Sequence, residues 1–313
     1  MVPDASLLPD VLPTARLTAS GMPIPEVRAE LRRIPDLRNA WTVAFAWLST
    51  FGIIAAAAWI GHPITWVIAF VLMGPQHARM ASLSHEAAHR TLFTNKRVND
   101  WVGRWVVGYP AFISTDLYRR GHMAHHKEEF GPNEPDMNLY NGYPVTKDSL
   151  QRKLRRDLFG ESGWKNLKSL LRGLTFEATR KHAARVVAAQ VVLFLLFLAA
   201  GWPQLYVFLW FLPWMTEWRL INRLRAIAEH GGMERSSDRR RTTHTVHQSH
   251  LAGFLMVPYN IGFHLAHHVD MGVPFRNLPK LHAELVAAGY VTPELEHPTY
   301  RQLWRQLSSR PTE

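Results

Sequence analysis

The sequence predicts an all-α integral membrane protein, with four transmembrane helices in two hairpins and a helical cytoplasmic cap. Two stretches, Trp41 to Ala78 and Val186 to Thr216, contain no Asp, Glu, Lys or Arg. A turn signal lies near the middle of each, Gly61-His62-Pro63 in the first and Gly201-Trp202-Pro203 in the second. Each half approaches the roughly 20 residues that cross an apolar core of about 30 Å. Each stretch therefore predicts a hairpin of two spans.

The predicted boundaries follow from these turns. The four spans cover residues 41–60, 63–82, 186–202 and 204–222. Residues 1–40 form a cytoplasmic segment with an amphipathic helix from Pro25 to Leu37, which begins with proline and is expected to lie on the membrane. Residues 83–185 and 231–313 form the predicted cap.

Basic residues determine the predicted orientation. Neither hairpin turn contains Lys or Arg, whereas the flanks contain several arginines, among them Arg38, Arg79, Arg185 and Arg219. Because loops rich in Lys and Arg stay in the cytoplasm, both termini and the cap are predicted to be cytoplasmic. The expected location is a multi-pass position in the membrane, the plasma (inner) membrane if the chain is bacterial.

The chain of 313 residues carries a net charge of +11. Basic chains often bind nucleic acid, but no nucleic-acid motif accompanies this charge, so no such partner is predicted. The topology itself requires basic cytoplasmic loops. Runs such as Arg152 to Arg156 and Arg239 to Arg241 are expected near anionic lipid headgroups. Docking of an acidic redox partner is the alternative interpretation.

Three histidine clusters stand out among the 17 histidines. They are HEAAH with His85 and His89, HMAHH with His122, His125 and His126, and HLAHH with His264, His267 and His268. On a helix, side chains three and four residues apart share one face, so each cluster can converge on one metal ion or on two neighbouring ions. His230, at the end of the fourth predicted span, is a ninth candidate ligand.

The absence of cysteine narrows the chemistry. Disulfides, thiolate zinc sites and iron–sulfur clusters are excluded. Imidazole and oxygen donors remain, and neutral imidazole is a good ligand for iron. Carboxylate-rich di-iron bundles use Glu-x-x-His pairs, which the predicted spans do not contain. Electrons for a redox reaction must then come from another protein.

The ordered set HxxxH, HxxHH, HxxHH resembles the membrane fatty acid desaturase and hydroxylase superfamily, from about Trp41 to Gly289. The resemblance implies one catalytic unit with a non-haem di-iron centre, O₂ as co-substrate, a fatty acyl lipid as substrate, and an electron donor such as ferredoxin or cytochrome b5 with its reductase. The eight box histidines match the family ligands, and His230 matches its extra histidine. The Glu229-His230-Gly231 element favours acyl-lipid desaturases within the superfamily. No catalytic residue separate from the metal centre is expected.

The family often holds a metal-bound water with an asparagine, and Asn260, four residues before His264, matches that position. Carboxylates often orient the rings of metal-bound histidines. The acids near the boxes are candidates for this second role, with a plain structural role as the alternative: Glu86, Glu229, Asp116, Asp136 and Asp270.

Three other interpretations stay open. Lipid hydroxylases and carotenoid hydroxylases or ketolases share the histidine pattern of this superfamily. HEAAH also matches the HExxH helix of zinc membrane proteases, which leaves both HxxHH boxes unused. A metal transporter is the third, but transporters place their ligands near the bilayer midplane, whereas the clusters here lie outside the predicted spans.

Overall fold

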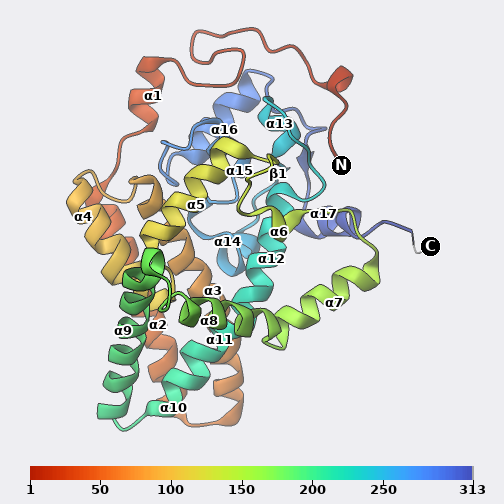
Figure 1. Ribbon diagram of the computed structural model, residues 1–313. Helices are drawn as coiled ribbons and strands as arrows, with labels where there is room; N and C mark the ends of the chain where they lie inside the picture. Colours follow the sequence, from red (N-terminus) through yellow and green to blue (C-terminus); the bar gives the residue numbers. More distant parts are fainter. Residues whose placement is uncertain (312–313) are drawn as a thin grey trace. The chain divides into compact units, whose positions relative to one another are not determined.

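The computed structural model describes residues 1–311 and is mostly helical (Figure 1). The chain divides into two compact units. The histidine unit comprises Met1–Ile34, Arg120–Gln151 and Arg223–Glu313, and the apolar unit comprises Pro35–Arg119 and Arg152–Asn222. Three of the four boundaries between units fall within helices: α5 (Thr115–Glu128), α7 (Lys147–Leu158) and α12 (Glu217–His230); the fourth lies between Ile34 and Pro35.

The apolar unit combines long helices with several short helical elements. Its other elements are α2 (Asp36–Ile60), α3 (Pro63–His89), α4 (Lys96–Trp101), the π-helix η2 (Val102–Gly108), the 3-10 turn η3 (Tyr109–Ala111), α8 (Glu161–Arg172), α9 (Glu177–Ala199), α10 (Pro203–Tyr206), the π-helix η4 (Val207–Phe211) and α11 (Leu212–Met215). The predicted turn between the first two spans is confirmed. Gly61 ends α2 with a φ of 66°, and Pro63 begins α3 after the N-cap His62.

Within residues 1–311, two helices are long and apolar enough to cross a membrane, α2 and α9. Only 28 % of the most apolar part of α2 and 17 % of that of α9 is buried. Side chains such as Trp41 and Leu48 on α2 and Leu196 on α9 are exposed instead. An exposed apolar surface of this length fits lipid contact better than a protein core. The two other predicted spans stay predictions.

The segment predicted as one span over residues 204–222 is not a single α-helix. It consists of α10, the π-turn η4, α11 and the start of α12, with a break at Thr216 (φ −119°, ψ −84°). Pro213 explains part of the irregularity, because it has no N–H for the carbonyl one turn earlier. The helix that contains most of the third predicted span, α9, begins at Glu177, and the helix that contains the second, α3, continues beyond residue 82 to His89.

The irregular backbone of η3 lies inside the apolar unit, and polar side chains donate hydrogen bonds to its carbonyl oxygens. The side-chain amide of Gln190 donates to the carbonyl oxygens of Tyr109 (2.7 Å) and Pro110 (3.0 Å). The indole of Trp210 also donates to Pro110, at 3.0 Å, and Tyr206 donates to Gln190, at 3.0 Å. Backbone groups that leave a helix in apolar surroundings need such partners. The segment before the second histidine box is thus packed against α9 and η4 through these hydrogen bonds.

The histidine unit is built from short elements. They are the 3-10 turn η1 (Ala5–Leu7), α1 (Pro25–Leu31), α6 (Met137–Tyr140), α13 (Arg239–Thr242), α14 (His250–Leu255), the 3-10 turn η5 (Pro258–Asn260), α15 (His264–Val269), α16 (Leu278–Ala287), α17 (Tyr300–Leu307), and the strands β1 (Thr245–Val246) and β2 (Glu296–His297). The two strands pair in parallel, a minor exception to the predicted all-α fold. Buried leucines such as Leu281, Leu285 and Leu303 form part of the core.

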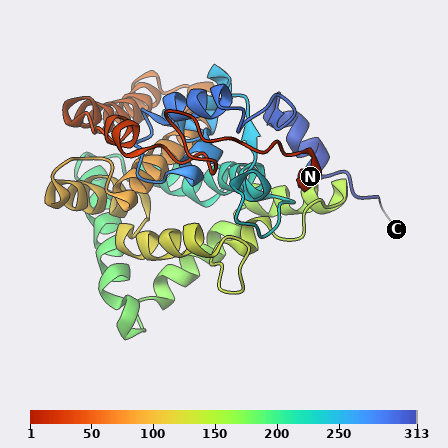
Figure 2. The ribbon, with the colours of Figure 1, turned by 90° about the horizontal axis from the view of Figure 1, so that it is seen from above.

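The predicted N-terminal helix is shorter than expected. It begins at Pro25 as predicted but ends at Leu31 rather than Leu37. Pro35 disfavours the helical conformation of the residue before it, so the chain leaves the helix there. The N-terminal chain, red in Figure 2, crosses the blue C-terminal helices of the same unit. The guanidinium of Arg16 donates to Glu284 of α16 at 2.9 Å, which fixes part of this crossing.

Candidate metal centre

Seven of the nine predicted ligands lie in the histidine unit, on three helices. The second box lies on α5, the third box on α15, and His230 is the last residue of α12. All seven are buried, with at most 6 % of any residue exposed: His122, His125, His126, His230, His264, His267 and His268. Buried ring nitrogens without water require partners within the protein or a bound ion.

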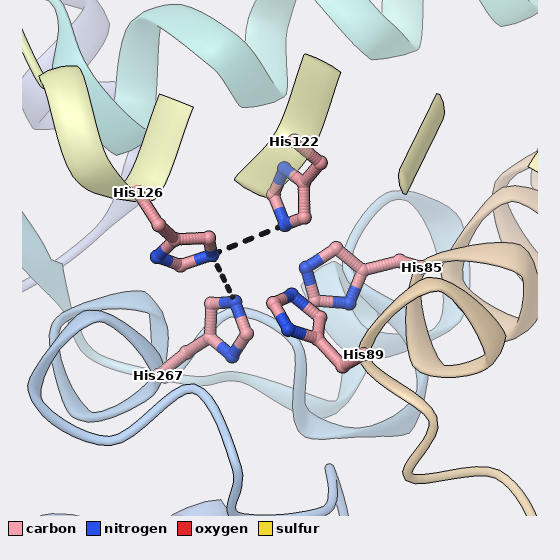
Figure 3. A group of neighbouring side chains, drawn as sticks. All are labelled: His85, His89, His122, His126 and His267. Atoms are coloured by element: carbon pink, nitrogen blue, oxygen red, sulfur yellow. Dashed lines mark hydrogen bonds between the residues drawn. The ribbon is translucent and has the colours of Figure 1, made fainter. Parts of the chain in front are cut away.

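The first cluster contains one ring from α15 and two from α5. The Nε2 atom of His126 lies 3.2 Å from Nε2 of His122 and 3.0 Å from Nε2 of His267, as the dashed lines in Figure 3 show. One candidate ligand atom from each of these rings lies within 4.8 Å of the others. Residues 141 positions apart thus meet at one point.

The second cluster contains rings from all three helices. The Nε2 atom of His264 lies 3.0 Å from Nε2 of His230 and 3.1 Å from Nε2 of His268. Candidate ligand atoms of His125, His230 and His268 also lie within 4.8 Å of one another. The histidine unit therefore contains two neighbouring groups of imidazoles, one around His126 and one around His230.

In the second cluster, the partner of each Nδ1 atom determines whether the Nε2 atom of the same ring carries a lone pair. The Nδ1 atom of His230 lies 2.9 Å from the carbonyl oxygen of Thr242, which can only accept a hydrogen bond. His230 therefore carries its proton on Nδ1. The Nδ1 atoms of His125 and His268 face the carboxylates of Glu134 (2.9 Å) and Glu129. In the neutral ring, this arrangement leaves Nε2 with a free lone pair.

Lone pairs that point at one another repel, unless a proton or a metal cation lies between them. Zinc binds histidine nitrogen at about 2.0–2.1 Å in a tetrahedral arrangement, which places two such ligand atoms about 3.3 Å apart. The Nε2 separations of 3.0 to 3.2 Å in both clusters are close to this spacing. The donor set and its spacing therefore fit bound transition-metal ions.

The protonation of these rings is consistent with metal binding. Burial lowers the pKa of His230, His264, His267 and His268 well below 6.5, and neighbouring charged groups lower it further. Neutral rings have lone pairs to donate. His125 differs: burial opposes its protonation, but the hydrogen bond and negative charge of Glu134 prevail and raise its pKa.

Glu129 and Glu134 are functional candidates that the sequence analysis missed. Both are buried. Arg239 lies 2.5 Å from Glu129 Oε1, so this carboxylate contacts both Arg239 and the ring of His268. The signal was present, because Glu129 follows His126 by three residues, one turn along the chain. Carboxylates that hold a ligand ring in position commonly surround metal sites.

His85 and His89 lie in the apolar unit, at the end of α3. Their ring centroids are 4.6 Å apart (Figure 3). Asn99 and Arg119 hold this helix end, donating to the carbonyl oxygen of Ala87 at 2.9 and 2.8 Å. These bonds replace the helical partners that the last carbonyls lack. The first box is thus one helical pair, as its spacing predicts.

The predicted outer residues have other contacts. Glu86 accepts a hydrogen bond from Thr91 at 2.8 Å, and its distance of 3.8 Å to His85 Nδ1 exceeds a hydrogen bond. Glu229 lies 3.9 Å from His264 Nε2 and accepts from Arg225 at 3.1 Å. The side chain of Asn260 is exposed, whereas His264 is buried. For all three, the predicted roles stay predictions.

The other acids named from the sequence have structural partners. Asp116 accepts three hydrogen bonds from Arg104, at 2.8 to 3.0 Å. Asp270 accepts from Arg28 of α1 at 2.9 Å and from Arg32 at 3.1 Å. Asp136 donates its backbone N–H to Glu134 at 3.1 Å. Asp136 thus contacts Glu134, the partner of His125, and Asp270 connects the end of the third box to α1.

Clusters of buried imidazoles with convergent lone pairs, in a chain with long exposed apolar helices, define a histidine-rich metalloprotein associated with a membrane. The sequence profile of the fatty acid desaturase family matches residues 63–303. The chain therefore belongs to the fatty acid desaturase family. It is an oxidoreductase that acts as a desaturase, and its family implies a lipid substrate.

Relatives of known activity support this assignment at low identity. The chain is 24 % identical over 286 residues to an sn-1 oleoyl-lipid 12-desaturase of Arthrospira platensis, covering 82 % of this chain and 77 % of that one. It is 23 % identical over 251 residues to a dihydrorhizobitoxine desaturase of Bradyrhizobium elkanii, covering 74 % and 71 %. A chloroplastic omega-6 fatty acid desaturase of Glycine max is 22 % identical over 289 residues, covering 84 % and 65 %.

Proposed function

We propose that the protein is an O₂-dependent membrane lipid desaturase that introduces a C=C bond into a fatty acyl chain. Two adjacent methylenes lose one hydrogen atom each. O₂ receives these two hydrogens together with two electrons and two protons, and two molecules of water form. The electrons come from a separate carrier protein such as ferredoxin or cytochrome b5, since the chain has no cysteine for an iron–sulfur cluster.

The observation that carries the proposal is the orientation of the rings around His264. His230 is protonated on Nδ1 by its bond to Thr242, so its Nε2 lone pair faces His264 at 3.0 Å. A buried arrangement of this kind is stable with a cation between the rings. Iron bound there would supply the one-electron and O₂ chemistry that removal of hydrogen from an unactivated methylene requires.

Nine histidines form the proposed ligand set for two iron ions. Seven are the buried rings of the histidine unit, and His85 and His89 of α3 complete the set. The order of the boxes along the chain and the match of the family profile from residue 63 to 303 support the inclusion of the α3 pair. In this proposal, Glu129, Glu134 and the Thr242 carbonyl hold the outer nitrogens and orient the rings.

The proposed topology keeps the four spans predicted from the charge pattern. Two of them, α2 and α9, satisfy length and apolarity. We place the termini and the metal centre in the cytoplasm, because basic residues flank the charge-free stretches and their turns have none. The acyl-lipid substrate is proposed from the Arthrospira relative, whose name specifies an oleoyl lipid.

The direct test compares lipids from cells with and without the protein by mass spectrometry. The proposal expects acyl chains that have lost two hydrogen atoms, and it expects His267→Ala to abolish this product. His250→Ala is the matched control, because His250 is exposed and lies outside the clusters. A product that has gained one oxygen instead identifies a hydroxylase and contradicts the proposal.

Metal analysis of the purified protein is the second test. The proposal expects two iron ions for each chain. One zinc and no iron supports the HExxH protease interpretation instead, which uses His85, Glu86 and His89 and leaves seven buried histidines unexplained.

A further inference from the structure

The outer face of α8 combines aromatic and basic side chains in the apolar unit. Trp164 is 53 % exposed and Leu171 is 44 % exposed, and the helical period places them on one stripe with Lys168 between them. Lys165 and Arg172 flank this stripe and are also exposed. Phe159 before the helix and Phe176 after it are 76 % and 63 % exposed.

The face of α8 next to this stripe is already occupied. Leu167 packs against the cluster of Ala78, Trp214 and Trp218. Gly163 approaches α11 so closely that a Cβ atom there would lie 2.1 Å from the carbonyl oxygen of Met215. The stripe with Trp164 therefore stays exposed beside the packed face, and rotating the helix to bury it would expose Leu167 instead.

The excess of basic residues around α8 indicates which partner covers the stripe. Residues 152–185 contain ten Lys and Arg and three Asp and Glu, so this short segment carries most of the net charge of +11. Exposed Trp and Phe beside Lys and Arg are typical of helices that lie in the headgroup layer of a membrane. The cation of Lys168 lies 5.9 Å from the Trp164 ring centroid, so its stem runs along the aromatic side chain.

The position of α8 in the chain supports the same partner. Four residues separate its end at Arg172 from the start of α9 at Glu177. Even fully extended, this link reaches less than about 20 Å. α9 is one of the two helices in the described chain that satisfy the requirements for a membrane span. With α9 inserted, α8 must lie close to the membrane surface.

We propose that α8 lies in the membrane interface and binds anionic phospholipid headgroups. Trp164 and Leu171 enter the layer, with Phe159 and Phe176 at either end. Lys165, Lys168 and Arg172 contact the phosphates. This surface is independent of the desaturase reaction, so the proposal stands even if the metal centre performs a different oxidation.

The chain contains no cysteine, so a single introduced cysteine is the unique labelling site. A label there can report how deeply one residue of α8 enters the lipid layer. Leu171→Cys and Ser169→Cys lie two residues apart, and the helical period places Ser169 well away from the apolar stripe. The full-length variants are labelled with a fluorescent dye in phosphatidylcholine discs with and without phosphatidylglycerol, and lipids with a nitroxide on the acyl chain serve as quencher. We expect strong quenching at position 171 and little at 169. Equal quenching at the two positions overturns the proposal.

A charge variant tests the lipid class. Lys165→Gln, Lys168→Gln and Arg172→Gln together shift the equilibrium between inserted and lifted α8 in anionic discs by roughly 100-fold toward the lifted state. Quenching at position 171 then no longer increases with phosphatidylglycerol. The control variant neutralises three exposed arginines elsewhere, Arg235, Arg301 and Arg305, and is expected to keep the increase.

An acidic redox protein is the competing partner for this surface. If the label at position 171 is not quenched and the triple variant instead raises the KM for a plant-type ferredoxin, the surface binds the electron carrier. That result overturns the lipid proposal.

Discussion

The ring Nδ1 of His230 and the backbone carbonyl oxygen of Thr242 form a hydrogen bond of 2.9 Å. Because a carbonyl accepts only, this bond fixes the position of the ring proton. The other nitrogen of His230 then presents its lone pair to His264, 34 residues further along the chain. A backbone contact thus prepares a side chain to bind a cation.

Removal of a ligand ring tests the metal centre most directly. His125→Ala and His267→Ala are expected to abolish desaturation and to lower bound iron, while the protein stays in the membrane, because neither residue lies on α2 or α9. Iron is measured by elemental analysis, and membrane retention by fractionation. Full activity in either variant contradicts the ligand assignment, and His250→Ala controls for a general loss of histidine.

The carboxylates behind the rings have a weaker effect. Glu129→Gln and Glu134→Gln retain the shape of the side chain but remove the charge that holds His268 and His125. Loss of such a partner commonly costs about 10- to 100-fold in metal affinity. Competition with a calibrated chelator measures that affinity. Glu26→Gln, on the exposed side of α1, is the control, and an equal effect there indicates a cause other than ring orientation.

Acid is expected to destabilise the metal-free protein. In the folded state, the pKa of four rings lies well below 6.5: His230, His264, His267 and His268. At a pH between this lowered pKa and the value of about 6.5 in the unfolded chain, the unfolded chain binds more protons than the folded protein. Their contribution is complete above about pH 6.5 and is lost progressively below it. His125 acts in the opposite direction, since its raised pKa favours folding at low pH. Four rings outweigh one, so the thermal midpoint of the chelator-treated protein falls from pH 7 to pH 5; a constant midpoint contradicts this.

Asp270 connects the third histidine box to α1 through Arg28 and Arg32. Asp270→Asn removes a buried charge from between two arginines. Because both arginines remain 38 % exposed, water screens the pair, and we expect a loss of about 1–2 kcal/mol in the free energy of unfolding. Thermal unfolding in detergent measures this loss. The double variant Arg28→Gln/Arg32→Gln is expected to show a larger loss, because it leaves the buried carboxylate of Asp270 without its two partners, and an unchanged midpoint in both contradicts the role of the contact.

Substitution of two glycines of the apolar unit by alanine is expected to change the thermal midpoint in different ways. Gly163→Ala places a methyl group 2.1 Å from the Met215 carbonyl oxygen, so α8 must move away from α11, at a cost of roughly 2 kcal/mol or more. A Cβ at Gly52 of α2 meets no atom within 4 Å, so Gly52→Ala is expected to be neutral or slightly stabilising. Comparison of their thermal midpoints checks the packing of α8. Equal midpoints contradict it.

Local pattern was sufficient for the turn between α2 and α3. Gly61 and Pro63 marked a turn because glycine adopts positive φ and proline starts helices, and both do so here. The pattern was insufficient for residues 204–222, where apolarity is continuous but the backbone is not. Pro213 and the break at Thr216 interrupt that segment, and α12 begins afresh at Glu217.

The sequence by itself determined which rings share a helix face, because the helical period depends only on spacing: His85 with His89, His122 with His126, and His264 with His268. Only the tertiary structure decided which faces of the histidine unit meet, and which acids stand behind the rings. Glu129 reaches His268 across 139 residues, and Arg28 reaches Asp270 across 242. Such pairs depend on chain crossings that residue spacing does not encode.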